Sequence, residues 1–216
     1  MKPTKNRFPK IAALAVVGLA LAAGCNRDPL RDLSPEDSQV FITNHDASVN
    51  FGTYKTFSIR DSVAVLGNQG QVQYSTTSRE LDFVARVINN LQQRGFVRVD
   101  RSQNPDLGVN VARVSNTYTG VTANPFFDPF WGGWGGWGWG GGLYYPQTFS
   151  TYQVRENYWY SEIIDLKNPR AGQNGQQQLP VVWTAEIRGN GIFDQTSISR
   201  VVDAVFAQSD YLRTSR

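Results

Sequence analysis

The segment TSRELDFVARVINNLQQR, residues 77–94, decides the fold of this chain. Apolar residues recur in it at steps of three to four, the spacing of one face of an α-helix. They are Leu81, Val84, Val87, Ile88 and Leu91. Thr77 and Glu80 have the spacing of a capping box, and Gly95 supplies a stop. The segment therefore predicts an amphipathic helix that buries one face on a sheet.

Segments with the pattern of β-strands lie on both sides of this helix. Apolar side chains take every second position in residues 107–111 and 181–187, which is typical of strands with one face exposed to water. Residues 61–75 are polar and contain Gly67 and Gly70, so we expect a loop there. Further strands are expected at residues 40–42, 54–59, 96–99 and 158–166.

A second amphipathic helix is expected near the C-terminus, capped by Asp194 or Thr196. Its apolar face would consist of Ile198, Val201, Val202, Val205 and Phe206. Residues 106–119 and 150–167 are long enough to be consecutive antiparallel partners. The predicted fold is α+β, a mainly antiparallel sheet with two helices packed on one face and a long Gly/Trp-rich hairpin loop.

The N-terminus has the pattern of an export signal. Residues 1–10 are basic, residues 11–23 are apolar, and the run ends at Ala22-Ala23-Gly24-Cys25, which resembles a lipoprotein cleavage site. Cys25 is the only cysteine, so we expect it to carry the lipid. The alternative is an ordinary secretory signal cleaved near Ala23. Asn26 after the cysteine resembles the enterobacterial pattern for outer-membrane sorting, and we expect the protein to face the periplasm.

The predicted organisation is a signal peptide (1–24), a flexible tether (25–38) and one α+β domain (39–212) with an aromatic insert at 120–149. Four of the 21 Lys and Arg residues precede Cys25, which leaves 17 against 18 acidic residues in the mature chain. This balance disfavours a nucleic-acid partner.

The insert is the unusual part of the sequence, because residues 131–142 consist only of Trp and Gly. So much glycine disfavours a helix or an ordered strand. Its candidate contact residues are Trp131, Trp134, Trp137, Trp139, Tyr144 and Tyr145. Three interpretations stay open: a tolerated insertion packed on the domain, a contact with lipid headgroups or an envelope protein, and stacking on peptidoglycan or lipopolysaccharide sugars.

The residues point to no reaction. His45 is the only histidine, and we expect it in a turn, so we assign no catalytic residues, metal site or cofactor. A G-x-G-x-x-G pattern at residues 136–141 lacks the strand and helix that dinucleotide binding needs. The strand carboxylates are expected to face solvent, with a fold-assembled hydrolase pair as the alternative. They are Glu156, Glu162, Asp165 and Glu186.

Several short motifs occur in an order that resembles one family. They are Asn50-Phe51-Gly52-Thr53-Tyr54-Lys55-Thr56-Phe57, Arg94-Gly95-Phe96, Asn104-Pro105-Asp106-Leu107, Ile163-Ile164-Asp165-Leu166 and Val182-Trp183-Thr184-Ala185. Together they resemble domain-of-unknown-function family 4136, a group of predicted bacterial lipoproteins, over residues 39–212. The resemblance implies an exported α+β lipoprotein domain and carries over no activity or catalytic residue. The expected function is therefore a non-enzymatic, lipid-anchored envelope protein, with a glycan-binding module or a hydrolase as alternatives.

Overall fold

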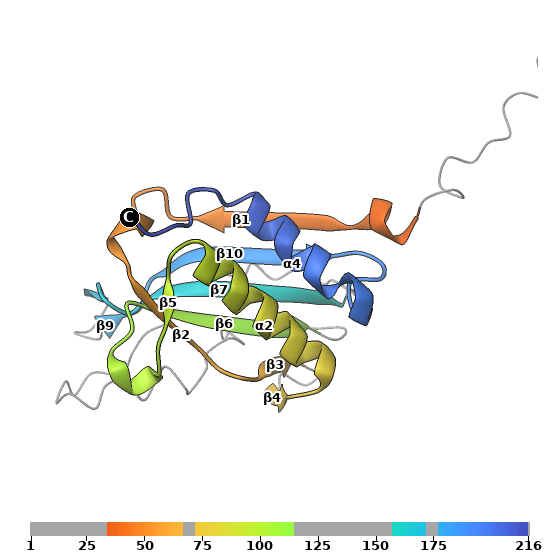
Figure 1. The fold of residues 1–216 in the computed structure, drawn as a ribbon, viewed down its shortest axis with the longest axis horizontal. Helices are drawn as coiled ribbons and strands as arrows, with labels where there is room; N and C mark the ends of the chain where they lie inside the picture. The colour runs from red at the N-terminus through yellow and green to blue at the C-terminus, as the bar shows by residue number, and fades with distance from the viewer. Residues whose placement is uncertain (1–33, 67–71, 115–156, 172–176, 216) are drawn as a thin grey trace, which may run out of the picture.

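The computed structural model describes residues 34–66, 72–114, 157–171 and 177–215. In these residues one large sheet carries two α-helices on the same face: α2 (Ser78–Gln93) and α4 (Ile198–Ala207) (Figure 1). The predicted α+β fold with two helices on one face is confirmed. The hairpin loop of the prediction lies outside the described residues.

The large sheet has the order β1-β10-β7-β6-β2-β5, with β3 also paired to β6 and β4 paired to β3. A separate two-stranded ladder joins β8 to β9. The strand bounds are β1 (Val40–His45), β2 (Thr56–Ile59), β3 (Val63–Leu66), β4 (Val72–Ser75), β5 (Val97–Arg98), β6 (Leu107–Val114), β7 (Tyr158–Asp165), β8 (Arg170–Ala171), β9 (Gln177–Gln178) and β10 (Val181–Arg188).

The sheet is mixed, which corrects the prediction of a mainly antiparallel sheet. The pairs β1–β10, β10–β7, β7–β6 and β3–β4 are antiparallel, whereas β2 and β3 run parallel to β6, and β5 runs parallel to β2. The cause is α2, which returns the chain along the sheet so that β5 and β6 run in the direction of β2. The predicted pairing of the segments around 106–119 and 150–167 is confirmed by β6 and β7.

Two paired antiparallel strands, at residues 63–66 and 72–75, replace part of the predicted loop at 61–75. These strands are β3 and β4, and Val63 and Leu66 are buried on the domain. The apolar run is only four residues long and is followed by Gly67 and Gly70, which hid it among turn-forming residues.

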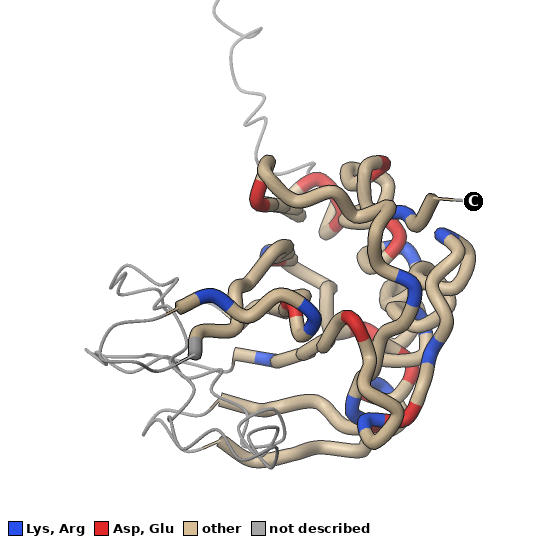
Figure 2. Tube along the Cα trace, turned by 90° about the vertical axis from the view of Figure 1, so that its left-hand side faces the viewer, with Lys and Arg blue, Asp and Glu red and all other residues tan. Residues whose placement is uncertain are grey.

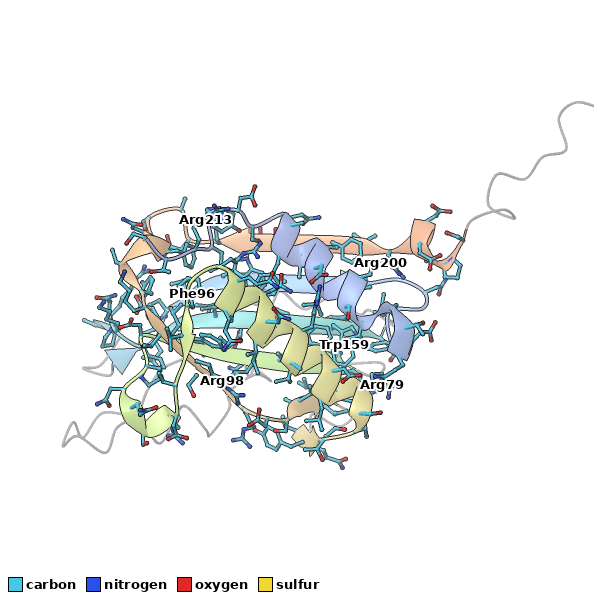
Figure 3. The ribbon with its side chains drawn as sticks, in the orientation of Figure 1. Arg79, Phe96, Arg98, Trp159, Arg200 and Arg213 are labelled. Atoms are coloured by element: carbon cyan, nitrogen blue, oxygen red, sulfur yellow. The ribbon has the colours of Figure 1, made fainter. Side chains whose placement is uncertain are left out.

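The core lies between the two helices and the sheet, and its centre is aromatic. The ring of Trp159 stacks on that of Phe83 with 4.3 Å between centroids, and its Nε1 donates a 2.9 Å hydrogen bond to the Ile192 carbonyl (Figure 3). Trp183 donates to Ser209 Oγ over 2.9 Å and packs near Phe206. Both indoles are therefore buried with their polar N–H groups satisfied.

The helix starts differ from the predicted caps. Thr77 is the N-cap of α2, but its side chain accepts no cap hydrogen bond. The Glu80 side chain, expected to complete the capping box, is buried instead and lies 3.1 Å from Arg113 Nε. Of the predicted apolar face, Val84, Val87 and Leu91 are buried, whereas Leu81 is 39% exposed. Helix α4 follows a 3-10 turn, Gln195–Ser197, whose N-cap is Asp194. The N-cap of α4 itself is Ser197, and neither residue makes a side-chain cap hydrogen bond.

Candidate functional site

The predicted contact and lipid residues lie outside the described residues. They are Cys25, Trp131, Trp134, Trp137, Trp139, Tyr144 and Tyr145. The structure describes the positions where the segments that carry them join the domain. These positions are Ser34 for the N-terminal segment, and Val114 and Asn157 for the insert.

Strand register places these junctions at the same end of the sheet. Val40 at the start of β1 lies opposite Arg188, and Ile187 lies opposite Trp159 of β7. Tyr158, the neighbour of Trp159, lies opposite Val114 at the end of β6. The first residues of β1 and β7 and the last of β6 therefore share one end, the end at which the orange strand β1 begins in Figure 1.

The start of the domain is held firmly at this end. A 3-10 turn, η2 (Pro35–Ser38), begins with a capping box in which Ser34 and Asp37 bond reciprocally. Gln39 Nε2 donates to the Asn190 carbonyl over 2.8 Å, and the Asn190 N–H donates to Ser38 Oγ over 3.1 Å. The last residues of the predicted tether are thus a structured part of the domain.

Gly189 makes this close approach possible. Its φ of 112° is a conformation that residues with a side chain rarely adopt. A Cβ at this position would lie 2.4 Å from the Ser38 carbonyl oxygen. A glycine is therefore required at position 189, where the chain leaves β10 and passes close to Ser38 at the end of η2.

The strands that lead to and from the insert carry an aromatic and charged cluster on the sheet face away from the helices. Arg188 lies over the Tyr158 ring at 4.8 Å from its centroid and pairs with Glu186 at 2.6 Å. Burial, with the charge of Glu186, raises the pKa of Tyr158, so the phenol stays neutral. Leu66, Ala112 and Tyr160 are buried beside it.

The strand carboxylates are not all solvent-facing, which corrects the prediction for two of them. Glu162 is fully buried and accepts hydrogen bonds from Asn110 Nδ2 at 2.9 Å and Tyr160 Oη at 3.2 Å. Asp165 is 3% exposed. Glu186 is half-buried, and Glu156 lies outside the described residues. Because β7 is covered on both faces, its polar positions are buried as well.

The two buried carboxylates do not assemble into a pair. Glu162 and Asp165 are three residues apart on β7, so their side chains point to opposite faces of the sheet. Glu162 lies on the same face of the sheet as Glu186 of β10, and Glu186 forms an ion pair with Arg188. Across the four described ranges, no group of three or more His, Cys, Asp and Glu residues could hold a metal ion.

Asp165 belongs to a second polar cluster at the opposite end of the sheet. Its Oδ2 accepts a 2.6 Å hydrogen bond from Tyr54 Oη, and its Oδ1 accepts from the backbone N–H groups of Lys167 and Asn168 at 2.9 Å each. Nearby, Asp106 Oδ2 accepts from the N–H groups of Lys55 and Thr56. Burial, with the bond to Asp165, raises the pKa of Tyr54 strongly.

A family model with the description "Domain of unknown function (DUF4136)" matches residues 42–209. The chain belongs to the DUF4136 family. Its structure is similar to the crystal structure of a DUF4136 family protein from Bacteroides thetaiotaomicron, with 29% sequence identity and a TM-score of 0.62. That match covers 83% of this chain and 100% of the other.

A weaker similarity links the chain to the PelC dodecamer from Paraburkholderia phytofirmans. The identity is 16%, the TM-score is 0.41, and the match covers 82% of this chain and 99% of that one. No curated protein gives a significant match.

The motifs that resemble the DUF4136 family meet in the cluster around Asp165. Tyr54 and Lys55 come from the first motif, Asp106 from the third and Asp165 from the fourth. Their bonds join β2, β6 and β7 at one end of the sheet. We assign this cluster a structural role in the DUF4136 domain, because its polar groups are satisfied by one another.

Sequence reasoning missed other residues that hold the domain together. Glu80 at the start of α2 had the spacing of a capping residue, but it is fully buried and lies 3.1 Å from Arg113 and 3.6 Å from Arg79. Gly189 carries no sequence pattern that would reveal its conformation. His45, expected in a turn, is the last residue of β1, and its ring stacks on Tyr211 at 3.8 Å between centroids.

Charge and hydropathy give no further site in the described residues. Lys and Arg residues are interspersed with Asp and Glu residues along the described trace (Figure 2). Within the ranges that the structure describes, no helix is long and apolar enough to cross a membrane.

Proposed function

We propose that this protein is a non-enzymatic, lipid-anchored lipoprotein of the bacterial cell envelope, acylated at Cys25 and bound to the outer membrane facing the periplasm. Its aromatic insert would contact the membrane surface. The observation that supports this proposal is that three described positions share one end of the sheet. They are Ser34, in the last part of the predicted tether, and Val114 and Tyr158, on either side of the insert.

The length of the tether limits the distance of this end from the membrane. Ser34 lies nine positions after Cys25, and an extended chain spans at most about 3.3 to 3.6 Å per residue. The anchored end would therefore stay within about 30 Å of the acylated cysteine. Val114 and Asn157, which flank residues 115–156, lie at this end, so in the proposed arrangement the rings of the insert would be within reach of the lipid headgroups.

The chemistry of the insert suits this location. Trp and Tyr rings combine an apolar body with a polar N–H or O–H, and they concentrate at the interface between water and lipid. The insert supplies Trp131, Trp134, Trp137, Trp139, Tyr144 and Tyr145. Its glycines would let each ring adjust to a fluid surface, whereas sugar-binding platforms need rings at fixed spacing.

Tryptophan fluorescence tests the membrane contact directly, because the emission of the two tryptophans outside the insert should not change when lipid is added. Trp159 and Trp183 are buried with satisfied N–H groups, so their emission should not respond to lipid. We expect the mature chain without acyl groups to show a blue shift on addition of phosphatidylethanolamine/phosphatidylglycerol vesicles. Deletion of residues 124–146 should abolish the shift.

The absence of a shift in the intact chain would contradict the membrane contact. A peptidoglycan ligand would give a different result, namely sedimentation with sacculi that is lost when Trp134 and Trp137 are replaced by Ala. The deletion variant keeps the buried Trp159 and Trp183, so an unchanged emission from these two residues would show that the variant is still folded.

A further inference from the structure

Strand β1 forms an exposed edge of the large sheet. The backbone N–H of Asp46 donates to the Val182 carbonyl over 3.0 Å, so even-numbered residues of β1 direct their backbone groups toward β10. Those of Phe41, Thr43 and His45 therefore point outward. In the described part of the chain, no backbone hydrogen bond reaches these outward groups.

This edge lacks the features that usually protect a sheet edge. The sequence Val-Phe-Ile-Thr-Asn-His of β1 contains no Lys, no Pro and no charged residue, and Val40 and Ile42 are 51% and 40% exposed on the same face. The opposite edge is divided between two shorter strands. Strand β5 has two residues, with Arg98 paired to Asp61 at 2.7 Å, and β4 has four, so neither is as long as β1.

An ion pair lies near each end of β1. At its start, Arg200 of α4 bonds to Gln39 and lies 3.7 Å from Glu36 (Figure 3). At its end, Asp46 is paired with Arg170 at 2.8 Å. A second strand beside β1 would therefore meet an ion pair at each end of the edge.

Helix α4 also leaves room along this edge. Arg200 bonds to Gln39, which precedes β1, and Gln208 bonds to Thr43 of β1. Ala204 lies four residues from each of them, and therefore on the same side of the helix. Its methyl group is small enough to let another copy approach.

We propose that the protein forms a homodimer in which β1 pairs antiparallel with β1 of a second copy, about a twofold axis at Thr43. Thr43 would pair with its counterpart, and Phe41 with His45 of the second copy, which satisfies all the outward groups of β1. Ile42 of each copy would lie diagonally across the axis from the other. A twofold axis perpendicular to the sheet lets both tethers reach one membrane that runs parallel to the sheet.

Disulfide trapping tests this register. In the full chain with Cys25→Ser, the variant Thr43→Cys places the only thiols on the axis. The Cα atoms of a hydrogen-bonded antiparallel pair are about 5.5 Å apart, within the range that a disulfide bridges. We expect oxidation to convert most of this variant into a covalent dimer. The matched variant Val97→Cys, on exposed β5, should stay monomeric.

A second measurement uses the chain with its native Cys25. Its mass in mild detergent, from sedimentation, should correspond to two copies. Thr43→Pro should halve that mass. It should leave the circular dichroism spectrum unchanged, because the N–H that it removes points away from β10 at the free edge of the sheet. Ile42→Lys should also produce monomers. Equal trapping of Thr43→Cys and Val97→Cys, a monomeric native chain, or trapping of another protein at residue 43 would overturn the proposal.

Discussion

Tyr54 Oη donates a 2.6 Å hydrogen bond to Oδ2 of Asp165, and this bond joins residues 111 positions apart in the sequence. Both side chains are buried. The bond connects the segment before β2 to the end of β7, which are separated in the sheet by β6. It therefore helps to hold the parallel and the antiparallel parts of the mixed sheet together.

Tyr54→Phe should destabilise the domain by about 1 to 3 kcal/mol, because Asp165 keeps its burial but loses its strongest side-chain donor. The free energy of unfolding in urea measures this loss. Tyr211→Phe is the matched control, since its hydroxyl makes only a 3.4 Å contact to Ser209. Equal effects of the two substitutions would contradict the role of the Tyr54–Asp165 bond.

Glu80→Gln should cost about 2 kcal/mol or more, because it removes the negative charge that Arg113 and Arg79 share in a buried position. Glu36→Gln is the control, since its contact with Arg200 is exposed and 3.7 Å long. This control should change the unfolding free energy by less than about 0.5 kcal/mol. A stability of Glu80→Gln within that margin would show that the buried pair contributes nothing.

The positions of the two helices and of the longest strands could be predicted from local periodicity. In β10, for example, the alternation of apolar and polar residues matches the structure, in which Trp183 is buried and Thr184 is not. The position of Glu162 could not be predicted in this way. A polar residue in a strand usually faces water, and only the burial of successive residues along β7 shows that both faces of this strand are covered.

The candidate site shows the same limit. The sequence identifies Cys25 and the aromatic insert as separate features about 100 residues apart. The nearest described residues, Ser34, Val114 and Asn157, lie at one end of the sheet because of the register of β1, β10, β7 and β6, which is a long-range property. The parallel course of β2 and the turn at Gly189 likewise depend on contacts that no local pattern reveals.

Gly189→Ala should lower the unfolding free energy by about 2 kcal/mol, because it combines an unfavourable φ with a clash against the Ser38 carbonyl. Gly52→Ala offers a comparison. Gly52 has no positive φ, and its nearest contact would be the Asn50 side chain at 3.1 Å. The smaller loss is therefore expected at Gly52, and the reverse order in urea unfolding would contradict the described approach of η2 to β10.

Asp46 predicts a specific pH dependence. Hydrogen bonds from the Ser48 hydroxyl, then from Arg170, lower the pKa of its carboxyl to about 2 from an ordinary value of 3.8. A lowered pKa stabilises the folded state fully above the unfolded value, and this contribution is lost as the pH falls through the folded value. The difference in unfolding free energy between the native chain and Asp46→Asn should be constant from pH 7 to about 5 and shrink between about pH 4 and 2.

Urea unfolding at a series of pH values measures this difference. Asp210→Asn is a suitable control, because Asp210 is exposed and makes only a 3.7 Å contact with Arg213. A difference for Asp46→Asn that stays constant down to pH 2 would contradict the effect of Ser48 and Arg170 on its carboxyl.

The most direct test of the account is the mass of the N-terminal peptide of the mature protein isolated from the cell envelope. The account predicts a peptide that begins at Cys25 and carries acyl chains on that residue. It also predicts that Cys25→Ser abolishes both the processing and the acylation. A mature chain with an unmodified Cys25, or one that keeps residues 1–24, would contradict the lipid anchor on which the proposed membrane contact depends.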